Sequence, residues 1–162
     1  MFQVGILTCS DRGAQGERED TSALAIREML PETFQVVRYR LVPDEQEAIS
    51  AALVAWCDQD NLDLILTTGG TGLTPRDVTP EATLAVVERL IPGLPEAMRA
   101  AGLTKTVHAV LSRAVAGVRR ETLIINLPGS PKAVRENLAV VLPALPHALE
   151  KIKGSAEECG AP

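Results

Sequence analysis

The sequence predicts a single α/β domain in which helices cover both faces of a doubly wound, largely parallel sheet. Short apolar runs recur along the chain, as expected for strands that are buried on both faces. Segments with helical periodicity separate these runs. Polar, glycine-rich segments follow several of the runs, at residues 10–16, 69–77 and 126–130. They would therefore lie at the carboxyl edge of the sheet, where such folds bind ligands.

The first half of the chain is expected to form three strands and two helices. Apolar and β-branched residues are concentrated in the expected strands, which are residues 2–8, 34–41 and 62–68. The first helix is expected over residues 20–30 and ends there because the ring of Pro31 cannot continue it. The second is expected to begin at Pro43-Asp44 and to run to residue 59, because apolar side chains recur there at helical spacing.

A third helix is expected from Thr79 to about Leu90. Thr79 is a favourable N-cap, Pro80 suits the first turn, and Glu81 suits the positive end of the helix dipole. A shorter helix is expected over residues 94–103.

The remaining third of the chain is clear only in part. The pattern of residues 104–116 predicts neither a helix nor a strand. Residues 121–126 are strongly apolar and are expected to form another strand. The turn that follows ends in Ser130, an N-cap, and Pro131, a good first helical residue. We expect two prolines, at positions 143 and 146, to kink or break the last helix.

The chain has the length of one compact domain, with 162 residues. It contains no internal repeat and no linker rich in glycine, serine or proline. We therefore expect one domain over residues 1–153 and a flexible tail over residues 154–162.

The composition argues against nucleic acids and membranes as partners. The formal net charge is −5 and only 2% of residues are aromatic, whereas nucleic-acid-binding domains usually carry a basic face and stacking aromatics. No apolar run approaches the ~20 residues that span a bilayer. The N-terminus reads directly into a strand and not as a signal peptide. The three cysteines, Cys9, Cys57 and Cys159, form neither a disulfide framework nor a metal motif, so a cytoplasmic setting is expected.

The segment Thr67-Thr68-Gly69-Gly70-Thr71-Gly72 is the strongest candidate for a ligand-binding loop. Its glycines let the backbone turn sharply and let amide groups approach phosphate oxygens. The segment is neither a Walker A loop nor a GxGxxG fingerprint. Its glycine content alone supports two interpretations equally, a tight strand-to-helix turn and a phosphate cradle.

Asp77 follows this loop, in the segment Arg76-Asp77-Val78-Thr79-Pro80-Glu81. A carboxylate beside a phosphate cradle is repelled unless a metal ion lies between them, and Mg²⁺ is usually held by one or two carboxylates together with substrate phosphates. The simpler interpretation is that Asp77 pairs with Arg76 or caps the following helix. These residues alone favour the simpler interpretation.

Other polar residues at the same edge also have simple explanations. Asp44 stands at the start of a helix, where Glu47 three residues later suggests a capping box. Ser10-Asp11-Arg12 either contacts a ligand or forms a solvated turn. Residues 126–130 lead into a helix N-terminus, which attracts anions. Ser112 has no nearby His–Asp pair in sequence, so a hydrolase triad is unsupported.

Taken together, these segments resemble the MogA/MoaB family of molybdopterin adenylyltransferases and the corresponding G domain of gephyrin and its plant relative. Two signatures are specific in combination: the glycine loop with Arg76-Asp77-Val78-Thr79-Pro80-Glu81-Ala82, and the turn Asn126-Leu127-Pro128-Gly129-Ser130-Pro131. Shorter matches extend the resemblance over nearly the whole chain, at Gly5-Ile6-Leu7-Thr8, Ser10-Asp11-Arg12, Gly16-Glu17, Asp20, Pro43-Asp44-Glu45, Leu111-Ser112-Arg113 and Ala116-Gly117.

The resemblance implies an enzyme of molybdenum-cofactor synthesis that uses ATP and Mg²⁺ to convert molybdopterin into adenylyl-molybdopterin, with release of pyrophosphate. In this family the terminal phosphate of molybdopterin attacks the α-phosphate of ATP, and such catalysis relies on positioning and charge neutralisation. The two functional aspartates of the family fall on Asp44 and Asp77. We expect Asp77 to hold the metal and the phosphates, and Asp44 to position the substrate and share the metal.

The resemblance also implies which residues bind substrate or nucleotide. The glycine loop is expected to hold phosphate, and the others to surround the nucleotide and the pterin. These residues are Ser10, Asp11, Gly69, Gly70, Thr71, Gly72, Thr79, Ser112, Gly117, Asn126, Pro128, Gly129 and Ser130.

The family further implies a homotrimer, for which the apolar residues 91–103 are a candidate contact, and hand-over of the product to a molybdate-inserting protein. The competing interpretation is a non-catalytic trimer of the MoaB type that binds a pterin or nucleotide or acts as a scaffold. Retention of both Asp44 and Asp77 favours catalysis. Molybdate-inserting proteins carry extra domains and a different glycine loop, and CinA-like domains fit the two signatures less well.

Overall fold

The computed structural model describes residues 1–17 and 19–156, which form one six-stranded sheet with the order β2-β1-β3-β6-β5-β4. Strands β1, β2, β3 and β6 run parallel, whereas β5 is antiparallel to both of its neighbours, β6 and β4. The strands are β1 (Phe2–Cys9), β2 (Phe34–Val42), β3 (Leu64–Thr68), β4 (Arg89–Leu90), β5 (Ala116–Arg119) and β6 (Thr122–Leu127). The prediction of a largely parallel sheet is confirmed.

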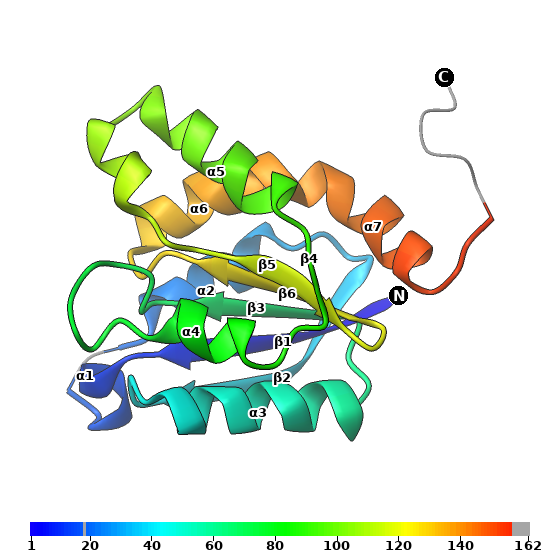
Figure 1. Cartoon of the computed structure of the whole chain (residues 1–162), viewed down its shortest axis with the longest axis horizontal. Coiled ribbons are helices and arrows are strands. Elements are labelled where there is room, and N and C mark those ends of the chain that lie inside the picture. Colours follow the sequence, from blue (N-terminus) through cyan, green and yellow to red (C-terminus); the bar gives the residue numbers. More distant parts are fainter. Residues whose placement is uncertain (18, 157–162) are drawn as a thin grey trace.

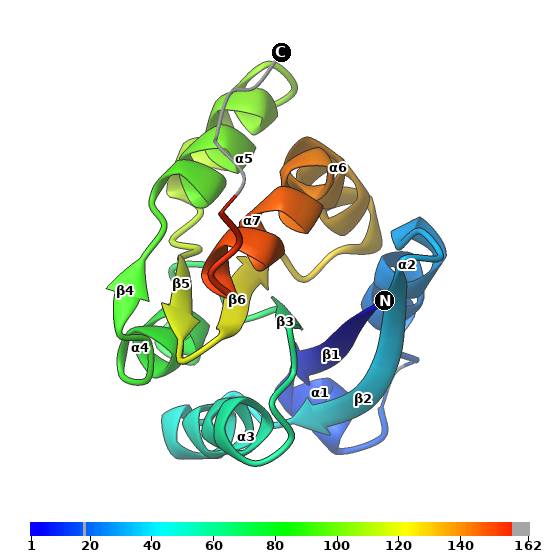
Figure 2. The same ribbon diagram turned by 90° about the vertical axis from the view of Figure 1, so that its right-hand side faces the viewer.

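Helices cover both faces of this sheet (Figures 1 and 2). Helices α2, α5, α6 and α7 contribute to the core on one face, and α3 and α4 to the core on the other. The helices are α1 (Asp11–Ala14), α2 (Thr21–Met29), α3 (Gln46–Asp58), α4 (Thr79–Leu84), α5 (Gly93–Leu103), α6 (Pro131–Val141) and α7 (Leu145–Ile152), with the 3-10 helices η1 (Val107–Leu111) and η2 (Leu142–Ala144). Within the described residues, none of the helices has the length and apolar character needed to cross a membrane.

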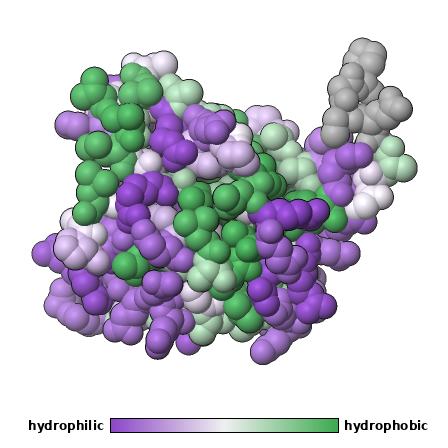
Figure 3. All heavy atoms as spheres, in the orientation of Figure 1, coloured by the Kyte–Doolittle hydropathy of each residue, from purple (hydrophilic) through white to green (hydrophobic). Residues whose placement is uncertain are grey.

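Large apolar side chains remain exposed where α5 ends and η1 begins. Figure 3 shows hydrophobic residues gathered over this part of the surface. We call this the α5–η1 patch; its members are each between 47% and 73% exposed and are Leu103, Val107, Val110 and Leu111. Contiguous exposed apolar surface of this kind is typical of an interaction surface.

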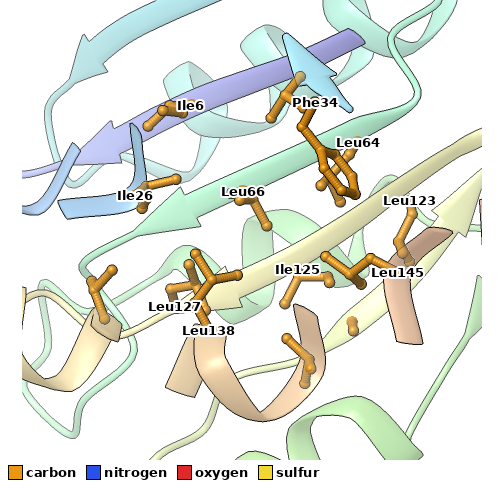
Figure 4. Close-up of a cluster of buried hydrophobic side chains, with 14 of the residues drawn as sticks. Ile6, Ile26, Phe34, Leu64, Leu66, Leu123, Ile125, Leu127, Leu138 and Leu145 are labelled. Atoms are coloured by element: carbon orange, nitrogen blue, oxygen red, sulfur yellow. The ribbon is translucent and has the colours of Figure 1, made fainter. Parts of the chain in front are cut away.

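Alternating side chains on the central strands supply the two cores. Leu64 and Leu66 of β3 belong to the core beside α2 and α6, whereas Ile65 between them belongs to the core beside α3. Figure 4 shows the first of these cores, with Leu64 and Leu66 among the side chains from β1, β6 and the covering helices. Because successive side chains of a strand point to opposite faces, a strand buried on both faces must be apolar throughout. This explains why the central strands were visible in the sequence.

Two predicted helix starts are wrong. Helix α3 begins at Gln46, with Glu45 at the N-cap and no side-chain cap, so Asp44 and Glu47 do not form the expected capping box. The carboxylate of Asp44 instead accepts a hydrogen bond from the main chain of Asp11. Helix α4 has Val78 at its N-cap, so Thr79 lies inside the helix and does not cap it. A tertiary contact thus takes the Asp44 side chain, whereas the Thr79 hydroxyl is buried without a hydrogen-bond partner.

The helix expected to reach Leu90 is also wrong, because α4 ends at Leu84 and Arg89–Leu90 form strand β4. Strand β4 pairs with β5, which lies at the end of the stretch that predicted no definite structure. Gly117 of β5 permits this pairing, because a Cβ there would lie 2.7 Å from the carbonyl oxygen of Arg89. The short edge pair therefore depends on a close approach that the local pattern does not reveal.

The last part of the chain follows the prediction. Ser130 caps α6 by accepting a hydrogen bond from the main chain of Ala133, and Pro131 stands in the first turn. The helical run then breaks at η2, which contains Pro143, before α7 begins. Residues 154–156 follow α7, and the rest of the expected tail, residues 157–162, lies outside the described residues.

Candidate functional site

The loops predicted to bind ligand meet at the carboxyl edge of the sheet. Thr8 of β1 pairs with Thr68 of β3, and Thr68 pairs with Leu127 of β6, so the three strands end together. The hydroxyl of Thr68 donates to the carbonyl of Pro128 at 2.6 Å, and the N–H of Gly69 donates to the carbonyl of Leu127 at 3.2 Å. The glycine loop and the turn after β6 are therefore joined directly.

Two glycines of the loop are required by the fold. Gly69 and Gly70 have positive φ angles of 93° and 70°, which side chains rarely adopt. A Cβ at Gly69 would lie 2.4 Å from the carbonyl oxygen of Cys9, and one at Gly70 would lie 2.2 Å from Oγ1 of Thr79. The tight-turn interpretation is therefore correct for these two residues.

The same loop also has main-chain groups free for an anion. The N–H of Gly69 is used within the sheet, so this amide does not belong to a phosphate cradle. In the part of the chain that the structure describes, no acceptor is found for the N–H groups of Gly70, Thr71 or Gly72. The segment can therefore be both a tight turn and a phosphate-binding loop, in which the amides of Gly70, Thr71 and Gly72 are the ones available to phosphate.

Asp44 is held at one carboxylate oxygen and free at the other. Its Oδ2 accepts the main-chain N–H of Asp11 at 3.0 Å, while Oδ1 is buried without a hydrogen-bond partner. Burial raises the pKa of this carboxyl, the charges of Asp11 and Asp77 raise it further, and the Asp11 hydrogen bond and Arg76 act in the opposite direction. An unpartnered buried oxygen of this kind requires an explanation, such as a ligand or an ion.

Asp77 is likewise hydrogen-bonded through only one of its two carboxylate oxygens. Its Oδ2 accepts two hydrogen bonds from Thr74, from the main-chain N–H at 3.0 Å and from the hydroxyl at 2.8 Å. No described residue donates to its Oδ1. Both simple interpretations of Asp77 are wrong, because Arg76 pairs with Asp11 and α4 has no side-chain cap.

The charges around these two aspartates are predominantly negative. Arg76 reaches Asp11 with two hydrogen bonds, of 3.0 and 2.9 Å, and this contact lowers the pKa of Asp11. Asp44 and Asp77, whose charges interact, each keep an oxygen without a donor. A polyphosphate would be repelled here unless a cation accompanied it.

The residues at this site fit Mg²⁺ held jointly with a substrate. No group of three or more His, Cys, Asp or Glu side chains among the described residues could hold a metal ion by itself. Asp44 Oδ1 and the hydroxyl of Thr79 are both buried without partners and lie beside Gly70, where a Cβ would be 3.2 and 2.2 Å from them. Magnesium suits such a site because it usually takes one or two carboxylates and completes its shell with phosphates and water.

Two cavities adjoin the glycine loop. The first, of about 270 Å³, contains Ser10, Asp44, Gly69, Gly129 and Ser130 among its lining residues. The second, of about 380 Å³, contains Thr71, Gly72, Ser112 and Pro128. Neighbouring residues of the same two loops thus line different cavities, so the loops lie between them.

The first cavity receives the N-termini of two helices. Thr21 and Ser22 of α2, and Ser130 and Pro131 at the start of α6, are in its lining. The N-terminus of a helix attracts anions through its free N–H groups and its dipole. Because Glu19, Asp20 and Asp44 also line this cavity, an anion would bind at the helix N-termini together with a cation that offsets the carboxylates.

Six predicted site residues line neither cavity: Asp11, Gly70 and Asp77 at the edge of the sheet, and three interior residues, Thr79, Gly117 and Asn126. Asn126 is fully buried and bonds internally, donating to Thr67 and Thr83 and accepting from the main chain of Val115. Gly117 lies within β5, and Thr79 lies buried behind Gly70. The amide of Asn126 joins β6 to β3 and α4, so this side chain lies behind the cavities and not in their lining.

Sequence reasoning missed residues that shape the site from a distance. Arg113 donates hydrogen bonds to main-chain carbonyls of the glycine loop and its continuation. His108 lines the second cavity with Arg99 and Asn137. Arg113 was visible only as part of the matching segment Leu111-Ser112-Arg113, where nothing local indicated its partners.

These features define an α/β domain with a candidate ligand-binding site at the carboxyl edge of its sheet. The family model described as a probable molybdopterin binding domain matches residues 5–147. The molybdopterin adenylyltransferase of Helicobacter pylori strain J99 is 44% identical over 157 residues, which cover 95% of this chain and 89% of that protein. Gephyrin of Dictyostelium discoideum is 48% identical over 90% of this chain, a match that covers 22% of gephyrin.

A solved structure agrees with these relatives. The crystal structure of the molybdopterin biosynthesis enzyme MoaB from Thermus thermophilus superposes with a TM-score of 0.91 at 60% identity, over 96% of this chain and 98% of that one. The chain belongs to the molybdopterin-binding domain family.

Proposed function

We propose that this protein is a molybdopterin adenylyltransferase of molybdenum-cofactor synthesis, which transfers the adenylyl group of Mg-ATP to molybdopterin. The observation that carries the proposal is the pair of half-free carboxylates, Asp44 and Asp77, beside the glycine loop. Because two carboxylates repel phosphate, a polyphosphate would bind beside them together with a divalent cation, as Mg-ATP does. The names of the adenylyltransferase and MoaB relatives support the same reaction and pathway.

We propose that ATP and molybdopterin each occupy one of the two cavities and that their phosphates meet at the glycine loop. Gly69, Gly129 and Ser130 line the first cavity, and Thr71, Gly72 and Pro128 line the second. Two ligands that entered from these cavities would bring their phosphate ends to the same two loops. Catalysis of this kind consists mainly of positioning two reactants and neutralising charge.

In the proposed reaction, an oxygen of the molybdopterin terminal phosphate forms a bond to the α-phosphorus of ATP. The bond from that phosphorus to the β-phosphate bridging oxygen breaks, and pyrophosphate leaves. The free N–H groups of Gly70, Thr71 and Gly72 would donate to phosphate oxygens. Asp44 and Asp77 would hold Mg²⁺ through their free oxygens, and the ion would lower the charge that develops on the leaving pyrophosphate.

The direct test is a pyrophosphate-release assay with purified protein. We expect release from Mg-ATP only when molybdopterin is added, with adenylyl-molybdopterin formed in equal amount. Omission of Mg²⁺ should abolish release. If molybdopterin and ATP both bind but no pyrophosphate forms, the protein is a binding module and the proposal is wrong.

The variant Asp77→Asn tests the role of the carboxylate. It keeps the shape of the side chain and an oxygen for Thr74, but removes the charge. We expect a folded protein that still binds molybdopterin and transfers adenylyl about 10²- to 10³-fold more slowly, as for other lost charge-stabilising groups. Asp60→Asn is the control, because Asp60 also accepts two hydrogen bonds, from Arg38, but follows α3 and does not belong to the loops at the carboxyl edge of the sheet. Near-normal turnover of Asp77→Asn would assign Asp77 a purely structural role.

We also propose that the chain assembles as a homotrimer. The exposed apolar side chains extend the expected contact beyond residues 91–103, because the α5–η1 patch includes η1 as well as the end of α5. Light scattering at micromolar concentration should give three times the chain mass. Val107→Glu, which places a charge at a residue that is 73% exposed, should lower that mass without unfolding the monomer. A monomeric wild-type protein would contradict the proposal.

A further inference from the structure

The loop between Gly72 and Asp77 is closed at its base by one side chain, that of Arg113. Its Nε donates to the carbonyl oxygen of Gly72 at 2.8 Å, and its Nη2 donates to the carbonyl oxygen of Asp77 at 2.7 Å. The main-chain N–H of Arg113 also donates to the carbonyl of Thr71 at 3.0 Å. Three main-chain carbonyls of one loop are thus bound by one distant residue.

The guanidinium that makes these contacts is itself fixed. Its Nη1 pairs with Oε1 of Glu81, in the first turn of α4. This contact with Arg113 lowers the pKa of Glu81, so the pair is ionised near neutral pH. The side chain of Arg113 is 35% exposed, and its planar group uses all three nitrogens at once. Arg113 is therefore held at a defined place and orientation relative to α4.

The position of the loop base sets the position of the Asp77 carboxylate. Within the loop, Thr74 holds Asp77 Oδ2 through its N–H and its hydroxyl. Gly72 lies so close that a Cβ there would be 2.8 Å from the same oxygen. A shift of either end of the loop would therefore rotate the carboxylate and move its free Oδ1.

We propose that Arg113 is a positioning residue that presets Asp77 for metal and phosphate, without touching either. This inference rests on the proposed function of Asp77. Residues that orient a metal-binding carboxylate typically change metal affinity or activity by about 10- to 100-fold when they are replaced. Lysine is a poor substitute, since one ammonium group cannot bind two carbonyls and a carboxylate with the geometry of the planar fork.

Arg113→Lys is the test variant and Arg119→Lys is its matched control. Arg119 also forms a two-nitrogen contact with a carboxylate, that of Asp58, and donates to a carbonyl, that of Val86. It stands in β5 and lines neither of the cavities beside the glycine loop. The control therefore loses a comparable network without affecting the loop.

Two measurements are made on both variants. Hydrogen–deuterium exchange without any ligand reports on the amides of residues 71–78. These amides should exchange faster in Arg113→Lys than in the wild-type protein, and at the wild-type rate in Arg119→Lys. The Mg²⁺ concentration for half-maximal adenylyl transfer should rise roughly 10-fold or more in Arg113→Lys and stay at the wild-type value in the control. If Arg113→Lys does not fold, Glu81→Ala replaces it, because it removes the acceptor that fixes the guanidinium but leaves Arg113 in place.

The outcomes separate this inference from the proposed function. Wild-type exchange in the loop of the test variant would overturn the inference, whatever the protein catalyses. Faster exchange with an unchanged Mg²⁺ requirement would also overturn it, since Asp77 would then be positioned without Arg113. A wild-type protein without adenylyl transfer would overturn the proposed function, while the exchange measurement would still decide whether Arg113 holds the loop.

Discussion

Asp11 and Asp44 exchange hydrogen bonds, each donating its main-chain N–H to the carboxylate of the other at 3.0 Å. The two residues are 33 positions apart, one following β1 and the other following β2. The exchange fixes Asp44 at Oδ2 and leaves Oδ1 buried without a partner. A residue that local sequence assigned to a helix cap is thus kept available for a ligand.

The variant Asp44→Asn should make the unliganded protein more stable and nearly inactive. A carboxyl whose pKa is higher in the folded protein than in the unfolded chain loses stability as the pH rises through the interval between those values. The pKa of Asp44 is raised mainly by burial, so its charge destabilises the fold at neutral pH. We expect the melting temperature to rise at pH 7, and the gain to shrink as the pH falls toward about 4, the ordinary pKa of an aspartate.

Thermal melting of both proteins across this pH range checks the prediction, with the transfer assay alongside. A lower melting temperature for Asp44→Asn at pH 7 would mean that its contact with Asp11 needs the full charge.

Removal of Arg76 should shift the pH dependence of activity. The guanidinium lowers the pKa of Asp11 by direct hydrogen bonds and opposes the rise in the pKa of Asp44. In Arg76→Met both pKa values rise, so the acid limb of the activity profile should move to higher pH if ionised Asp44 is required. The melting temperature should change little, because the pair is exposed and such pairs contribute little to stability.

Arg38→Met is the control for this shift, since Arg38 forms a similar exposed pair with Asp60. Profiles that coincide for wild type and Arg76→Met would show that neither Asp11 nor Asp44 controls the acid limb.

Substitutions of Gly70 and Gly72 should have different effects: the first should lower stability, and the second should weaken nucleotide binding. Gly70→Ala places a side chain at a φ of 70° and against Thr79, so it should cost at least about 1–2 kcal/mol for the left-handed conformation alone. Gly72 has no such backbone restriction, and a side chain there meets Oδ2 of Asp77 at 2.8 Å. Gly72→Val should therefore weaken nucleotide binding more than it lowers the melting temperature.

Calorimetric titration with Mg-ATP and thermal melting of the two variants give this comparison. A folded Gly72→Val protein with wild-type affinity would show that the loop serves only as a turn.

The two buried thiols should be inert in the native protein. Burial raises the pKa of Cys9 to about 12 and that of Cys57 to about 11, and the thiolate is the reactive form. Cys159→Ser removes the one cysteine outside the described residues and leaves these two. We expect no reaction with a disulfide reagent at pH 8 until denaturant is added, and then two thiols per chain. Fast labelling of the native variant would contradict the burial of Cys9 or Cys57.

Several parts of the fold and of the site follow from local sequence alone. The central strands are visible because side chains on both of their faces enter a core, as at Leu64, Ile65 and Leu66. The cap at Ser130 is visible because its hydrogen bond reaches only to Ala133. The meeting of the glycine loop with the turn after β6 follows from parallel strands that end at one edge.

Long-range contacts decide the rest, and these leave no local pattern. Strand β4 replaces the end of an expected helix because Gly117 lets it approach β5. Asp44 is drawn from the helix start by Asp11, and Arg113 binds Gly72 from 41 positions away. Periodicity and capping describe interactions over a few residues, so they report which segments form helices and strands. The partner of a side chain depends on how those segments pack, which is why the free oxygens of Asp44 and Asp77 emerge only in the folded chain.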